Sequence, residues 1–202
     1  MVEESLRASG KVLPELVERQ TETAAKAADY FGVPVNYPSN VRFDPRLMGT
    51  SIGGYQTIDS RYGITVGYNP EIARLSAAER QGIADHEAVH VAQPGKEQLL
   101  GLYAIMNGRH SRISFPLGRA IVEGGAEYVR EKIGRRGDFK SYYQWYELAK
   151  AIDKYVPLKR IYRVAEQSPE NAVSMIEDAC RHPDVQMKLW NAMLYSNSHI
   201  KN

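Results

Sequence analysis

The pattern of apolar and polar positions predicts a mainly helical chain. Apolar residues recur at helical spacing from Leu6 to Tyr30, with interruptions expected near Gly10 and Pro14 and an end before Pro34. Further helices are expected over residues 76–92, 97–106, 120–128, the aromatic-rich stretch after 138, 168–180 and 185–195.

Strand-like runs occur only before residue 70. Tyr55–Ile58 and Gly63–Tyr68 are separated by the turn-forming stretch 59–62, which predicts a β-hairpin, and Val41–Phe43 is a further strand candidate. We therefore expect an α+β fold with a small antiparallel sheet beside the 76–92 helix and helical additions at both ends.

The length predicts one domain. A chain of 202 residues can bury a full core, and no repeat or convincing linker divides it. Within residues 1–202 we expect an N-terminal helical segment at 1–34, a core at 41–133 and a C-terminal helical segment at 138–202.

Residues 86–90 read HEAVH, and they fall in the second half of a well-delimited helix. Ser76 and Glu79 have the spacing of a capping box, and a Gln-Pro-Gly sequence follows the expected last residue, Ala92. Positions i and i+4 of a helix share a face, so the imidazoles of His86 and His90 can point at one spot and bind one metal ion. Two partly buried histidines on an amphipathic helix are the alternative.

Two carboxylates further along the chain extend this pattern. Glu87 is not placed as a ligand, but it can accept a proton from a metal-activated water. Glu123 lies in a predicted helix beside Gly124 and Gly125, and a glycine pair inside a helix allows close approach to a neighbouring helix. Glu123 is thus the expected third ligand. Glu127, one turn later, either orients a liganding imidazole or is a solvated surface charge.

The stretches HEAVHVAQ and VEGGAEYV together resemble the zincin metallopeptidases of the glutamate-ligand branch, the gluzincins. The chain is most similar there to the peptidase-MA-like proteins, which pair an HExxH helix with an EGxAEY helix. The resemblance spans residues 51–132. It implies a zincin-like core and one Zn²⁺ per chain, held by His86, His90 and Glu123, with Glu87 as general base and Glu127 supporting a ligand.

A metzincin site fits poorly, because it needs a glycine and a third histidine soon after His90, and the next histidine is His110.

Other residues are weaker candidates for contacts to substrate or transition state. His110 and Arg112 belong to a basic loop expected between the two ligand helices, and Tyr128 and Tyr142 could donate to an oxyanion. Solvated loop surface and packing between helices are the respective alternatives.

Composition bears on which partners the protein binds and on its cellular compartment. Twenty-six basic and 24 acidic residues give a net charge of +2, which does not call for a nucleic-acid partner. The start of the chain is acidic, no run has the length of a membrane span, and a single cysteine, Cys180, excludes an internal disulfide. We expect a cytoplasmic protein without a membrane partner, whose oligomeric state the sequence leaves open.

The function expected from the sequence is zinc-dependent hydrolysis of peptide bonds in a peptide or protein substrate. The main alternative is a zincin-like binding or regulatory protein without proteolytic turnover. A third reading is a helical module that binds a partner through its aromatic segment, with the HExxH pattern arising by chance; it predicts that no metal binds.

Overall fold

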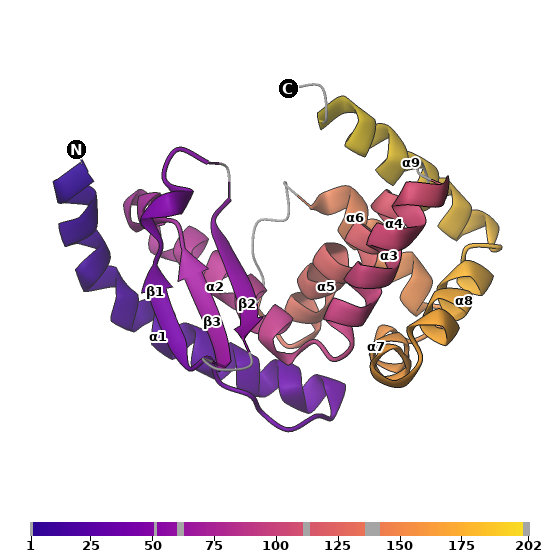
Figure 1. Cartoon of the computed structure of the whole chain (residues 1–202), viewed down its shortest axis with the longest axis horizontal. Helices are drawn as coiled ribbons and strands as arrows, with labels where there is room; N and C mark the ends of the chain where they lie inside the picture. The colour runs from indigo at the N-terminus through magenta and orange to yellow at the C-terminus, as the bar shows by residue number, and fades with distance from the viewer. Residues whose placement is uncertain (1, 51, 60–62, 111–113, 136–141, 200–202) are drawn as a thin grey trace. The chain divides into compact units, whose positions relative to one another are not determined.

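The computed structural model describes residues 2–50, 52–59, 63–110, 114–135 and 142–199 (Figure 1). The chain divides into two compact units: Met1–Ala92 with Arg130–Asp138, and Gln93–Val129 with Phe139–Asn202. The units therefore divide elsewhere than the three expected segments. Helices dominate and the strands form one small sheet, which confirms a mainly helical α+β fold. No helix in the described ranges is both long and apolar enough to cross a membrane.

The sheet of the first unit has three strands: β1 (Asn40–Phe43), β2 (Gly54–Asp59) and β3 (Gly63–Tyr68). Their order is β1-β3-β2, so β3 is central and β2 lies at an edge. The predicted hairpin is confirmed by the antiparallel pairing of β2 with β3, although its turn residues 60–62 lie outside the described part. The expectation of a wholly antiparallel sheet is wrong, because β1 pairs parallel with β3.

Burial is consistent with the central position of β3. The central strand ends in three buried residues that include Val66 and Tyr68, and a central position protects them better than an edge would. The hairpin places β2 on one side of β3. Strand β1 pairs with the other side of β3 and runs parallel to it. The short helices η1 (Pro45–Leu47) and η2 (Pro70–Arg74) lie in the connections on either side of the hairpin.

Helix α1 (Val2–Phe31) runs without a break through Gly10 and Pro14, so the predicted interruptions are wrong. A proline inside a helix costs about 3 kcal/mol, and long-range packing offsets that cost. Leu16, Ala24 and Phe31 on α1 are all buried. One apolar cluster joins α1, β3, η2 and α2 (Ala77–Ala92), and its buried members are Leu16, Val66, Tyr68, Ile72, Ala84 and Val91.

The second unit is built from helices. They are α3 (Lys96–His110), α4 (Ser114–Arg119), the π-helical turn η3 (Ala120–Gly124), α5 (Gly125–Lys132), α6 (Tyr143–Asp153), α7 (Leu158–Gln167), α8 (Pro169–Ala179) and α9 (Pro183–His199). The end of α5, from Arg130 onward, belongs to the first unit. The helices expected near 97–106, 120–128, 168–180 and 185–195 are confirmed, as is the aromatic helix, which forms α6.

Two helices of this unit were not predicted. The basic loop expected around residues 109–119 is largely helical, since α3 continues to His110 and α4 begins at Ser114. Helix α7 was missed although Leu158, Ile161, Tyr162 and Ala165 recur at helical spacing and are all fully buried.

Candidate metal centre

The local sequence of α2 explains why its second half can hold functional side chains. Ser76 and Glu79 form the predicted capping box: the amide of Ser76 donates to Oε2 of Glu79 at 2.9 Å, and the amide of Glu79 donates to Oγ of Ser76 at 3.3 Å. The helix ends at Ala92, as expected, and every residue from Ala84 to Ala92 is buried. Side chains on this half are therefore held on all sides.

The two histidines of α2 point at each other. Their Nε2 atoms lie 3.0 Å apart, and the ring planes are nearly perpendicular at 89°. Each residue is only 7 % exposed. Nitrogens bound to one tetrahedral zinc at 2.0–2.1 Å would lie about 3.3 Å apart, so the spacing of the pair is close to that of two ligands of one ion.

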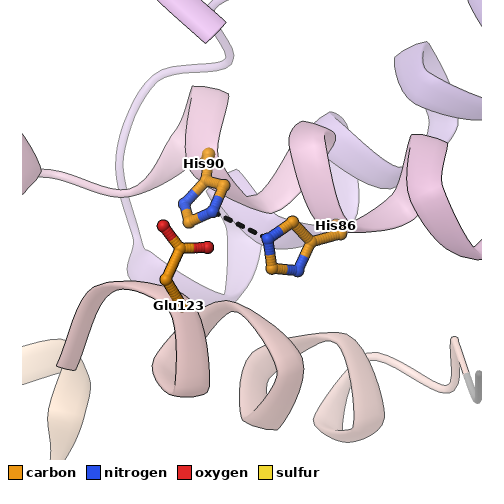
Figure 2. A group of neighbouring side chains, drawn as sticks. All are labelled: His86, His90 and Glu123. Carbon is orange, nitrogen blue, oxygen red and sulfur yellow. Dashed lines mark hydrogen bonds between the residues drawn. The ribbon is translucent and has the colours of Figure 1, made fainter. Parts of the chain in front are cut away.

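Glu123 completes a group of three. One ring nitrogen each of His86 and His90 and one carboxylate oxygen of Glu123 all lie within 4.8 Å of one another. Figure 2 shows the carboxylate of Glu123 directed toward the histidine pair, which the dashed line joins. Two imidazoles and a carboxylate are a donor set typical of a catalytic zinc. The residues present therefore fit a divalent metal ion.

Glu87 lies against the edge strand. A Cβ atom built at Gly54 of β2 would come within 3.1 Å of Cγ and of Oε1 of Glu87, so the absence of a side chain at residue 54 leaves room for this carboxylate. Glu87 is 7 % exposed and is not among the three grouped residues. Its position between the ligand histidines in the chain and beside β2 in space is compatible with the predicted role of a base.

Tyr68 lies near Glu87 and is hydrogen-bonded to Gln20. The hydroxyl of Tyr68 donates to Oε1 of Gln20 at 2.7 Å, and both residues are fully buried. Burial raises the pKa of Tyr68 well above its ordinary value, and the negative charges of Glu87 and Asp85 raise it further. Tyr68 is thus a neutral donor at any physiological pH.

Asp85 anchors the helix just before the first histidine. Its carboxylate accepts from Nε and Nη2 of Arg19 on α1, both at 2.8 Å, and from the hydroxyl of Thr23. Asp85 is 1 % exposed, so this bidentate pair is largely shielded from water. Asp85 was not predicted as a functional residue. The sequence did contain a signal for it. Asp85 directly precedes the HEAVH motif, in a half of the helix whose other residues are apolar or belong to that motif.

The glycine pair after Glu123 allows the close approach to neighbouring helices that the sequence predicts. A Cβ at Gly124 would lie 2.2 Å from the carbonyl oxygen of Trp145 on α6, and a Cβ at Gly125 would lie 2.0 Å from the hydroxyl of Tyr162 on α7. The prediction of close approach is therefore confirmed. The neighbouring helices are α6 and α7, and a Cβ at Gly125 would also meet Nε2 of Gln93, the residue after α2, at 3.5 Å.

Glu127 and Tyr128, which were also predicted at the site, are both buried. Glu127 is 3 % exposed, so the alternative of a solvated surface charge is wrong, and its role beside a ligand stays a prediction. Tyr128 is buried, and its hydroxyl donates to Oδ2 of Asp153 at 2.8 Å.

Tyr142 precedes α6 and packs on Trp145, with ring centroids 5.4 Å apart. Arg112 lies outside the described residues, as does the side chain of His110. Contacts of these residues to a substrate stay predictions.

Comparisons with protein-family models, with curated proteins and with solved structures found no match to this chain.

Proposed function

We propose that this protein is a zinc-dependent metallopeptidase of the gluzincin type, with one Zn²⁺ held by His86, His90 and Glu123. The observation that carries the proposal is the convergence of these three ligand atoms within 4.8 Å, with a second carboxylate, that of Glu87, directly after His86 in the chain. A metal site without hydrolytic function has no need of that second carboxylate.

The roles of the side chains follow from their chemistry. When bound, zinc supplies Lewis acidity, which lowers the pKa of water and polarises a carbonyl. Glu87 accepts a proton from the water that attacks the peptide carbonyl carbon and passes it to the leaving amine nitrogen, as the carbon–nitrogen bond breaks.

The edge strand β2 supports a peptide as the substrate class. Within the described residues, β2 pairs with β3 along one edge and with no strand along the other. An extended peptide can add to such an edge through main-chain hydrogen bonds. Because Gly54 of β2 contacts Glu87, a peptide bound along the outer edge would pass near the proposed base.

The test compares Glu87→Gln with wild type on zinc content and on cleavage of dye-quenched casein. The variant should retain zinc and lose at least about 10²-fold in rate, because a positioned general base contributes that much. Glu79→Gln is the matched control on the same helix, since glutamine also serves in a capping box. A Glu87→Gln protein that cleaves casein at the wild-type rate contradicts the mechanism.

A wild-type protein that holds zinc but cleaves neither casein nor a mixed peptide library supports a zincin-like binding or regulatory protein instead.

A further inference from the structure

The helix that carries Glu123 changes its hydrogen bonding at that residue. Between α4 and α5 lies the π-helical turn Ala120–Gly124, and the amide of Gly125 reaches back five residues to the carbonyl of Ala120. A π turn shifts the bonding register of the backbone and displaces carbonyls from their usual helical donors. Such turns inside α-helices occur frequently at functional sites, and here the turn contains a proposed metal ligand.

Two side chains from other segments donate to the carbonyls of this turn. The hydroxyl of Tyr162 on α7 donates to the carbonyl oxygen of Ile121. Nε2 of Gln93, the residue that follows α2, donates to the carbonyl oxygen of Val122 at 3.2 Å and to the Tyr162 hydroxyl at 2.7 Å. One connected network therefore satisfies two consecutive carbonyls immediately before Glu123.

The network is buried and its fit is specific. Tyr162 is fully buried and Gln93 is 6 % exposed, so water cannot readily replace a hydrogen bond that the network loses. The amide of Gly125 also donates to the carbonyl of Val122, and Gln93 is a second donor to that oxygen. Gly125 is required for the network, because a Cβ there would lie 2.0 Å from the Tyr162 hydroxyl. The glycine after the turn and the tyrosine on α7 are thus matched to each other.

We infer that Tyr162 and Gln93 are positioning residues for Glu123, which hold the π turn in the register that directs its carboxylate at His86 and His90. Each residue of an α-helix turns the chain by about 100°, so loss of the extra residue of a π turn would rotate Glu123 by about that angle relative to α4 or α5. The inference rests on the proposed function, since it requires that Glu123 bind the metal.

The experiment measures zinc affinity by competition with a chromophoric chelator, using the full chain. Tyr162→Phe keeps the ring and removes only the hydroxyl. We expect its zinc affinity to fall about 10- to 100-fold, the range found when a hydrogen-bond partner that orients a metal ligand is removed. Gln93→Met, which keeps the length of the side chain without its donors, should lower the affinity in the same direction and serves if Tyr162→Phe does not fold.

Two comparisons separate positioning from general destabilisation. Tyr155→Phe loses a 2.7 Å hydroxyl hydrogen bond to Asp184 in the same unit, and its zinc affinity should equal that of wild type. In a Glu123→Ala background, Tyr162→Phe should cause no further loss, because the residue through which it acts is gone.

An unchanged zinc affinity in Tyr162→Phe overturns the inference, as does an equal loss with and without Glu123. A wild-type protein that binds no zinc overturns the metal centre itself. This outcome differs from failure of the positioning inference, because it is seen in the wild type before any variant is compared.

Discussion

Gly124 offers a direct test of how the helix carrying Glu123 packs on α6. The substitution Gly124→Ala adds one methyl group whose carbon would lie 2.2 Å from the carbonyl oxygen of Trp145 and 2.3 Å from its carbonyl carbon. Both distances are far below the 3.4 Å at which ordinary contact begins. The obstacle is backbone, so no rotation of a side chain can relieve it, and the two helices must separate by about 1 Å.

The expected magnitude follows from two opposing effects. Overpacking costs about 1–3 kcal/mol, and a clash with backbone belongs at the upper end of that range. Replacing glycine by alanine in a helix returns about 1 kcal/mol. We therefore expect Gly124→Ala to lower the free energy of unfolding by about 2 kcal/mol. Gly101→Ala on α3 is the matched control, because a Cβ there meets nothing within 4 Å and should stabilise by about 0.5–1 kcal/mol.

Urea denaturation followed by tryptophan fluorescence measures the free energy of unfolding of the second unit in both variants. The chain has two tryptophans, Trp145 and Trp190, and both belong to the second unit together with Gly101 and Gly124. If Gly124→Ala proves as stable as Gly101→Ala, the close packing of η3 on α6 is refuted.

Two further predictions concern residues of the first unit. This unit lacks tryptophan, so unfolding of these variants is measured by circular dichroism. Asp85→Asn should lower the free energy of unfolding by about 2 kcal/mol, because it weakens buried hydrogen bonds from Arg19 and Thr23. The control is Asp178→Asn, which removes an exposed ion pair with Arg181. Equal losses of stability in the two variants would contradict the role of burial. Hydrogen bonds from Arg46 and then Tyr55 hold the pKa of Asp44 well below its ordinary value of 3.8. A carboxyl group with a lowered folded-state pKa stabilises the fold above its unfolded pKa and loses that effect as the pH falls, so wild type should lose stability more steeply than Asp44→Asn between about pH 4 and pH 2. Parallel pH profiles would show that Asp44 makes no such contribution.

The parts of the site that the sequence predicts are those set by local spacing. The i, i+4 arrangement of His86 and His90 follows from helix geometry, and the capping box and the Gln-Pro-Gly stop delimit the helix around them. The structure groups these histidines with Glu123, as expected from the second motif. The histidine pair and the limits of its helix need only residues that are close in the chain, whereas Glu123 lies far along the chain and was expected from the second motif.

The features that sequence reasoning missed depend on contacts between distant segments. The partner of Asp85 is Arg19, 66 residues away, and without it an aspartate in a helix is indistinguishable from a solvated one. The π turn at Glu123 is supported by Gln93 and Tyr162, which no local pattern connects to it. The continuity of α1 through Pro14 likewise depends on burial against α2 and the sheet, which outweighs a local penalty.

The direction of β1 was missed for a related reason. An antiparallel hairpin can be predicted from its turn, but the strand that joins its other side depends on the path of the chain between Phe43 and Gly54. Nothing in the four residues of β1 specifies that path.

The metal content of the purified protein tests the central claim most directly. Elemental analysis of wild type, prepared without added metal or chelator and again after incubation with zinc, should give close to one zinc per chain. His86→Ala should give none, whereas His182→Ala, which removes a histidine stacked on Tyr155, should retain the wild-type content. A wild-type protein that contains no metal and takes up none would contradict the assignment of His86, His90 and Glu123 as a metal centre.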